Sequence, residues 1–349
     1  MKILFTADLH LTDLPRDEHR WDLFPWLSDQ ARKHQIDLLI LGGDITDAKN
    51  NHSAKLTNRL VENLIDFTEE NKWPNIYILR GNHDYVEESE PFFKFLKNLP
   101  RIHFVTKPTS LQSPEGKPFM LFLPNTRDYE KSWAEIDFEE YDMVFCHQTF
   151  DGAESETGFK LPGIPASVVK DAGYVYSGDI HKPQRVGKNI EYVGSPYRIR
   201  FGDDFTPRVL MIGETPSSKR QQQDLHFPTK NKILVDINGL GKSQGDWAGD
   251  AREGDQVKVR VHLNRKQYGE WPKIRNAIIG EAAEMKLELT GPELVAEQEK
   301  PAKASKATGK PAGGVGPEQA VAAYAEQKRL PAALAEAGKG YLKQAQERN

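Results

Sequence analysis

Five short motifs within the first 181 residues combine aspartate, histidine and asparagine, often beside glycine. Carboxylates, imidazoles and an amide form the ligand set that suits Mn, Fe or Zn. Two side chains spaced two residues apart in an extended loop, such as Asp8 and His10, can point into the same cavity. The motifs therefore predict a site for divalent cations. In chain order they are Asp8-Leu-His10, Gly42-Gly-Asp44, Gly81-Asn-His-Asp84, Cys146-His147 and Gly178-Asp-Ile-His181.

Each motif has an ordinary explanation when it stands alone. Asp44 after two glycines is typical of a turn in which aspartate caps the next helix. Asn82 is typical of a turn residue in a left-handed conformation, and His147 of a buried histidine at the end of a hydrophobic strand. All five motifs in this order, each at the end of a predicted strand, favour one shared site, because the loops at the carboxyl ends of strands in an α/β sheet converge on one rim.

Alternating hydrophobic runs and amphipathic stretches are expected to position these motifs. Early strands are predicted at 2–7, 36–41 and 75–79, and helices at 20–34 and 55–67. This βαβαβ order is typical of an α/β layered sheet. Few helical patterns separate the later strands, so we expect a mixed sheet paired with a second sheet. The later strands are predicted at 119–123, 141–146, 174–177, 190–193 and 209–212.

Composition limits the classes of protein. The chain has 349 residues and 39.5 kDa, enough for two or three domains. No apolar run approaches the roughly 18 residues needed to span a bilayer, so we expect no membrane association. The single cysteine, Cys146, excludes an intramolecular disulfide and suits the reducing cytoplasm, where we expect the protein to act. The net charge of −4 excludes a uniformly basic surface but allows a local basic face.

Texture along the chain indicates four segments. Residues 1–225 form the first domain, and residues 226–297 are expected to form a small α+β domain. Residues 298–316 are rich in Lys, Pro, Ala and Gly, and such a composition predicts a flexible linker. Residues 317–349 are Ala-rich and helical in propensity, but each helix is short, so this tail is expected to order only against a partner or to remain a frayed end.

The DLH, GGD, GNHD, CHQ and GDIH motifs together resemble the calcineurin-like metallophosphoesterase family across residues 1 to about 200. Within it, residues 177–184 and 192–196 resemble SbcD-type nuclease subunits of double-strand-break repair complexes, of cellular or phage origin. The resemblance implies a four-layer α/β/β/α sandwich, a small α+β cap domain that contacts DNA, and a helical C-terminal tail that binds an ATPase subunit.

The resemblance also implies roles for the motif residues. Asp8, His10 and His181 bind one metal ion, Asn82 and His147 bind the other, and Asp44 bridges both. His83 is then the catalytic residue that faces the leaving group. Asp47 and Asp84 are candidates for orienting imidazoles. The candidate metal ligands are Asp8, His10, Asp44, Asn82, His147, Asp179 and His181.

One ligand position departs from the family pattern. Asp179 stands where the family has a histidine that binds the second metal. Aspartate also binds divalent ions, and its negative charge favours hard, oxygen-preferring cations. We therefore expect two Mn²⁺ ions, with Mg²⁺ as the second possibility. The alternative is a weakened second site.

These observations predict a Mn-dependent DNA exonuclease and endonuclease subunit for DNA repair and recombination. In this interpretation, a water activated by two metals attacks the phosphodiester. The expected partners are DNA, an SbcC-like ATPase bound through residues 317–349, and a second nuclease subunit in a homodimer. The alternatives are a phosphatase or phosphodiesterase for small substrates, and a catalytically weakened DNA-end tethering subunit. Candidate DNA contacts are Tyr85, Lys182, Arg185, Arg198 and Arg200.

Overall fold

The computed structural model describes residues 1–71, 74–113, 116–214, 220–238 and 247–296. The chain divides into two compact units, Met1–Glu297 and Gln298–Asn349, and all described residues belong to the first unit. The predicted linker at 298–316 and helical tail at 317–349 lie outside the described residues. The predicted domain border between residues 225 and 226 stays a prediction.

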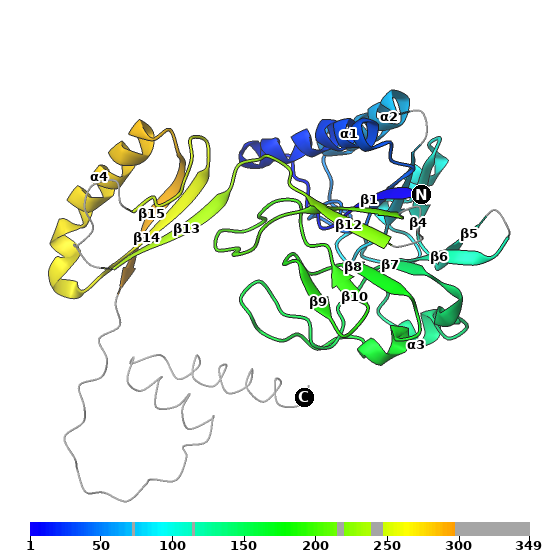
Figure 1. Ribbon diagram of the computed structural model, residues 1–349. Helices are drawn as coiled ribbons and strands as arrows, with labels where there is room; N and C mark the ends of the chain where they lie inside the picture. Colours follow the sequence, from blue (N-terminus) through cyan, green and yellow to red (C-terminus); the bar gives the residue numbers. More distant parts are fainter. Residues whose placement is uncertain (72–73, 114–115, 215–219, 239–246, 297–349) are drawn as a thin grey trace, which may run out of the picture. The chain divides into compact units, whose positions relative to one another are not determined.

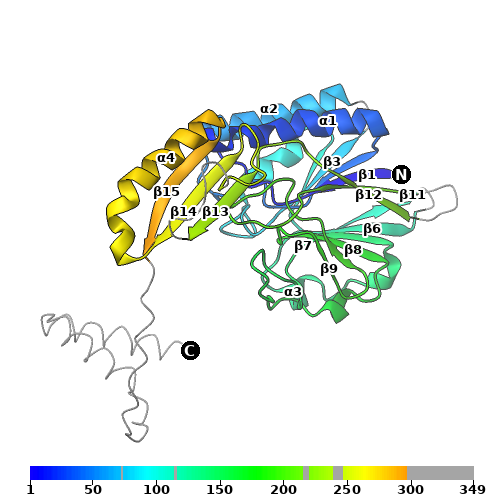
Figure 2. The same ribbon diagram turned by 60° about the vertical axis from the view of Figure 1, so that its left-hand side comes forward.

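The first of two six-stranded sheets has the order β12-β11-β1-β2-β3-β4 (Figure 1). Strands β1 to β4 are parallel, whereas β11 and β12 pair antiparallel at one edge. Helices α1 and α2 lie over one face of this sheet in both views (Figures 1 and 2). The elements are β1 (Lys2–Thr6), α1 (Leu23–His34), β2 (Leu38–Leu41), α2 (Ala54–Glu70), β3 (Asn75–Leu79), β4 (Ile102–Val105), β11 (Val209–Glu214) and β12 (Arg220–Leu225).

The second sheet has the order β5-β6-β7-β8-β10-β9. Strands β6, β7, β8 and β10 are parallel, and the two edge strands pair antiparallel. Its outer face is covered by short elements: α3 and the 3-10 helices Phe138–Glu140 and Ala166–Val169. The bounds are β5 (Thr109–Gln112), β6 (Pro118–Leu123), α3 (Tyr129–Ser132), β7 (Met143–His147), β8 (Tyr174–Gly178), β9 (Gln184–Val186) and β10 (Ile190–Tyr192).

Aromatic side chains fill the space between the two sheets. Phe5 of β1 meets Phe145 of β7 edge to face, with ring centroids 5.2 Å apart. Phe145 in turn stacks on Tyr176 of β8 at 5.2 Å and on Phe122 of β6 at 5.9 Å. Because the inner faces of both sheets share this core, their strand ends are held close together. The expected α/β/β/α sandwich is confirmed, with its second helical layer reduced to short helices.

A three-stranded parallel sheet follows in the order β13-β14-β15. The amphipathic helix α4 packs against it through Ile278 and Ala282. Its elements are β13 (Lys232–Asn238), β14 (Gln256–Leu263), α4 (Trp271–Glu284) and β15 (Glu288–Ala296). The small α+β arrangement thus matches the expectation, although the last strand is longer than the predicted 286–289.

The helix predicted at 20–34 begins three residues later, at Leu23. A 3-10 helix, Pro15–Asp22, precedes it and buries Arg20 and Trp21. Proline at the first turn favours an early start, because it lacks the N–H that the first helical turn leaves unpaired. In the described part of the chain, no helix is both long and apolar enough to cross a bilayer.

The aromatic core predicts a large cost for truncating Phe145, whose side chain is 0% exposed. Phe145→Ala should lower the free energy of unfolding by about 3–5 kcal/mol, because it removes contacts with both sheets and leaves a cavity. The matched control is Phe159→Ala, since Phe159 is 73% exposed. Urea denaturation of both variants measures the difference, and equal midpoints would contradict this description of the core.

Candidate metal centre

All five motifs lie at the carboxyl ends of strands, three in the first sheet and two in the second. The two loops that follow β1 and β2 are joined by backbone hydrogen bonds. The Asp8 N–H donates to the Gly43 carbonyl at 3.0 Å, and the His10 N–H donates to the Asp44 carbonyl at 2.9 Å. His147 differs from the other motif residues because it is the last residue of β7 itself. The rim predicted from the sequence is therefore present.

Four candidate ligands have a left-handed backbone: φ is 56° at Asp8, 41° at His10, 52° at Asp44 and 82° at Asp179. The extended loop expected for Asp8 and His10 is therefore wrong, since these conformations turn the chain sharply. Non-glycine residues pay about 1–3 kcal/mol for such a conformation. Strain of this kind persists only where the surroundings over-determine the backbone, and here it coincides with the motif residues.

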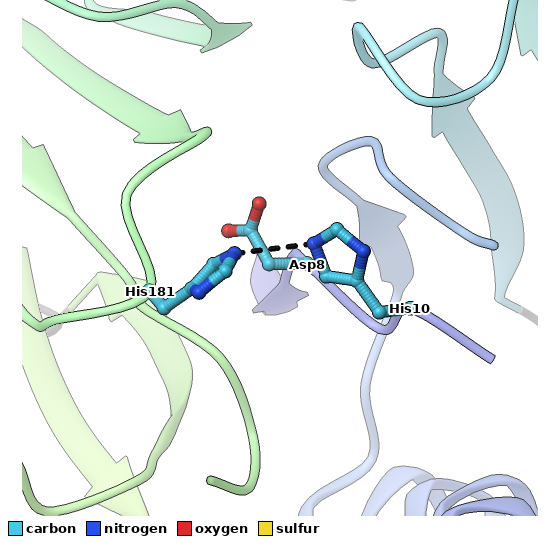
Figure 3. Close-up of side chains that lie close together, drawn as sticks. All are labelled: Asp8, His10 and His181. Atoms are coloured by element: carbon cyan, nitrogen blue, oxygen red, sulfur yellow. Dashed lines mark hydrogen bonds between the residues drawn. The ribbon is translucent and has the colours of Figure 1, made fainter. Parts of the chain in front are cut away.

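The first ligand group contains Asp8, His10 and His181, which point toward one another in Figure 3. The Nε2 atoms of His10 and His181 are 3.1 Å apart. One potential ligand atom from each of the three residues lies within 4.8 Å of the others. All three side chains are buried. The structure thus brings together the residues assigned to the first metal.

The second group surrounds the His147 imidazole. Its Nε2 lies 3.1 Å from Asn82 Oδ1, 3.3 Å from Asp44 Oδ1 and 3.8 Å from Asp179 Oδ1. The other carboxylate oxygen of Asp44, Oδ2, lies 3.7 Å from His10 Nε2 in the first group. Asp44 therefore presents one oxygen to each group, as a bridging ligand requires.

Two observations show that these donors fit divalent cations. Asp8 Oδ2 is buried and has no hydrogen-bond partner among the described residues. Asn82 Oδ1 lies 3.0 Å from both carboxylate oxygens of Asp44, so acceptors face acceptors; rotating the amide would let its nitrogen donate to Asp44 and His147 instead. A cation shared by the amide oxygen and the carboxylate favours the orientation that the structure has. The site thus suits a carboxylate-binding metal.

Each candidate imidazole is held through its far nitrogen, so its Nε2 is directed into the site. His10 Nδ1 is 2.9 Å from Asp47 Oδ1, and His147 Nδ1 is 2.6 Å from the Gly42 carbonyl. His181 Nδ1 is 3.0 Å from Glu156 Oε1. Partners of this kind fix the ring orientation of metal-binding histidines. Asp47 behaves as expected, whereas Glu156 belongs to no motif.

Asp84 has a different role from the expected one. Its carboxylate accepts from the backbone N–H groups of Gly81, Asp44 and Ile45 at 2.7, 2.9 and 3.0 Å. The expectation that it orients an imidazole is therefore wrong. Instead, the side chain ties the loop after β3 to the loop after β2. The same bonds hold Asp44 in its left-handed conformation.

Charge couples the members of the site. Burial alone would raise the pKa of Asp44, but the charge and hydrogen bond of His147, with His10 and His83, lower it. Burial would lower the pKa of His147, but Asp44, Asp8 and Asp179 raise it well above its ordinary value. A proton on His147 and a metal cation thus compete for the same negative pocket. Metal affinity should therefore fall as the pH falls.

Buried side chains outside the motifs hold the loop after β1. Arg20 Nη1 donates to the His10 carbonyl at 2.5 Å, and Ser195 Oγ donates to the Asp8 carbonyl at 3.1 Å. Tyr197 donates to the Leu9 carbonyl at 2.5 Å. In addition, the Thr149 hydroxyl donates to Asp179 Oδ2. No ligand-type spacing marks these residues, so the motifs gave no signal for them.

The candidate DNA contacts are placed unevenly. Tyr85 is 1% exposed, its hydroxyl donates to Asn125 Oδ1 at 2.8 Å, and the Arg80 and Arg127 guanidinium groups lie over its ring. This burial argues for a core role in place of the expected DNA contact. The basic side chains have different surroundings: Lys182 and Arg198 are half-buried, Arg200 is exposed, and exposed Arg185 pairs with Glu191 at 3.2 Å.

Comparison with known proteins places the chain in a family. The model of the calcineurin-like phosphoesterases matches residues 1–183. The chain belongs to this family. The motif residues of this phosphoesterase, with the exception noted at Asp179, therefore lie where the family pattern puts them.

Curated relatives of this phosphoesterase are distant but long. It is 25% identical to the SbcD subunit of the nuclease SbcCD from Escherichia coli K12, over 77% of this chain and 79% of that protein. It is 24% identical to exonuclease subunit 1 of enterobacteria phage T4, over 67% and 73% of the two chains. For the SbcD subunit of the nuclease SbcCD from Bacillus subtilis 168, the identity is 24% over 79% and 85%.

The close packing of the site predicts that Gly43→Ala disrupts it without touching a ligand. A Cβ at Gly43, where φ is 103°, would lie 2.3 Å from His147 Nδ1. We expect Mn²⁺ affinity to fall by at least roughly 10–100-fold, the effect of removing a group that orients a ligand. Isothermal titration with Mn²⁺ measures this.

The matched control is Gly280→Ala in α4, where a Cβ meets nothing within 4 Å. This variant should bind Mn²⁺ normally and gain about 0.5–1 kcal/mol of stability, because alanine favours a helix interior. Unchanged Mn²⁺ affinity in Gly43→Ala would contradict the described position of His147.

Proposed function

We propose that this calcineurin-like phosphoesterase is a Mn-dependent DNA phosphodiesterase with exonuclease and endonuclease activity. One observation carries the proposal: Asp44 directs one oxygen to each of two ligand groups, so the residues suit a pair of cations. The named activities of the relatives, a nuclease and an exonuclease, support DNA as the substrate.

When bound, two divalent ions would lower the pKa of a shared water and neutralise charge on the phosphate. The chain itself supplies rigid placement of the ligands and exclusion of bulk water, since Asp8, Asp44 and His147 are all buried. The Asp47 carboxylate keeps the His10 ring in place. These features hold the reacting groups in one geometry, which is worth several kcal/mol of the barrier.

We propose that His83 acts on the leaving group. Its backbone N–H donates to Asp44 Oδ1 at 2.8 Å, which fixes the residue beside the bridging ligand. Its ring is one-third exposed and meets His10 edge to face at 5.0 Å. Nδ1 faces the Asp47 carbonyl at 3.4 Å and the Asp47 carboxylate at 3.7 Å. A protonated His83 can therefore donate to the departing oxygen.

His83→Asn should lower the cleavage rate by about 10²–10⁴-fold, because it removes the proton donor. Mn²⁺ stoichiometry should remain that of the wild type, because His83 is not one of the proposed ligands. A single-turnover assay on linear DNA, with metal analysis of the same samples, measures both. Loss of bound metal together with activity would mean that His83 is a ligand instead.

The choice of substrate separates the nuclease from its alternatives. With Mn²⁺, we expect cleavage of linear DNA and of a p-nitrophenyl phosphodiester, and little action on p-nitrophenyl phosphate. A chelator should abolish both activities, and added Mn²⁺ should restore them. Hydrolysis of the monoester alone would favour a small-substrate phosphatase. Absence of turnover on all three substrates would favour a protein that tethers DNA ends.

Asp179 is proposed as the residue that tilts the site toward Mn²⁺. Its N–H donates to Asp8 Oδ1 at 3.0 Å, and Thr149 holds its carboxylate toward the second group. Asp179→His should raise affinity for Zn²⁺ relative to Mn²⁺, because imidazole is the softer ligand. Competitive metal titrations and rates with each ion measure the change. A large gain in the Mn²⁺ rate would instead show that Asp179 impairs the second site.

The partners remain part of the proposal. The names of the Escherichia coli and Bacillus subtilis relatives support a complex with an SbcC-like ATPase and a role in DNA repair and recombination. We propose residues 317–349 as the ATPase-binding segment, homodimerisation of the nuclease chain, residues 226–297 as a DNA-contacting cap, and Lys182, Arg185, Arg198 and Arg200 as backbone contacts. The single cysteine favours the cytoplasm as the place of action.

A further inference from the structure

A hairpin between β7 and β8 closes over the first ligand group. Residues Glu154 and Lys160 pair as an antiparallel bridge, and the Ser155 N–H donates to the Phe159 carbonyl at 2.8 Å. The Gly158 N–H donates back to the Ser155 carbonyl at 2.9 Å, with Gly158 in a left-handed conformation at φ 82°. These bonds define a tight turn with Glu156 within it.

The hairpin is fastened to the segment that carries His181. The Glu154 N–H donates to Gln184 Oε1 at 2.8 Å, and Gln184 Nε2 donates to the Glu154 carbonyl at 2.7 Å. Gln184 is the first residue of β9 and lies three residues after His181. The position of Glu156 relative to His181 is thus fixed by two backbone-to-side-chain bonds.

Glu156 contacts His181 on the side away from the ligand group. Its Oε1 lies 3.0 Å from Nδ1, while the Nε2 of the same ring lies 3.1 Å from His10 Nε2. His181 is 8% exposed, and the Glu156 side chain is 22% exposed. The pair is therefore shielded from water, unlike an exposed ion pair, which contributes little.

We propose that Glu156 is a positioning residue that orients His181 for metal binding. It completes a set in which Asp47 holds His10 and the Gly42 carbonyl holds His147. A carboxylate on Nδ1 keeps the proton there, so that Nε2 presents its lone pair to a cation. The inference rests on the metal site of the proposed function, but not on DNA as the substrate.

The test compares Glu156→Ala and Glu156→Gln with a matched control. Glu154→Gln removes the same charge two residues away, and the Glu154 carboxylate has no hydrogen-bond partner among the described residues. Mn²⁺ binding to each full-length variant is measured by isothermal titration and by electron paramagnetic resonance. We expect Glu156→Ala to weaken one of the two Mn²⁺ ions by roughly 10–100-fold, with Glu156→Gln intermediate and the control unchanged.

Thermal unfolding in the presence of a chelator separates positioning from folding. The Glu156→Gln midpoint should match that of Glu154→Gln, because the neutral amide still accepts from Nδ1. The inference is overturned if both Glu156 variants bind two Mn²⁺ ions as tightly as the control. It is also overturned if the loss of affinity follows the loss of stability. A wild-type protein that binds two Mn²⁺ ions without cleaving DNA would contradict the proposed function and leave this inference standing.

Discussion

The rest of the site depends on the burial of carboxylates beside one another. Asp8 is 0% exposed and Asp44 is 2% exposed, and both lie with His147 in one group of potential ligands. Burying like charges costs free energy unless cations or hydrogen-bond donors compensate for them. The surrounding imidazoles supply part of that compensation, and bound metal ions supply it more fully. Everything nearby serves to keep these groups from moving apart.

Rigid backbone holds the charged groups together. Two sheets with a common aromatic core fix the strand ends, and the Asp84 carboxylate ties two of the loops to each other. The left-handed conformations of Asp8 and Asp44 store strain that this network must offset. A flexible loop would relax by moving the carboxylates into water. The fold therefore stabilises an arrangement that the isolated loops would not adopt.

The sequence was informative where chemistry and hydrophobic pattern coincide. Asp8, Asp44 and Asn82 follow hydrophobic runs that form strands, so the shared rim could be predicted from chain order alone. Glu156 and Thr149 could not, because each acts on a partner 25 or 30 residues away through contacts that no local period marks. The helix start at Leu23 was displaced because the preceding 3-10 turn takes up part of its apolar pattern.

Charge and aromaticity alone were weaker guides than the motifs. Tyr85 follows the loop after β3, yet its ring is covered by Arg80 and Arg127, which come from different parts of the chain. Arg185 and Arg208 look free in the sequence, but both reach Glu191. Such pairings depend on how strands are ordered in the sheet, which spacing does not reveal. A basic run therefore indicates a surface less securely than a ligand motif indicates a site.

Anomalous scattering from a crystal grown with Mn²⁺ tests the central claim most directly. We predict two anomalous peaks about 3.5–4 Å apart, the separation typical of paired catalytic metals. Asp44 should contact both peaks, with His181 at one and His147 at the other. A single peak, or two peaks of which Asp44 touches only one, would contradict the account of a bridged metal pair.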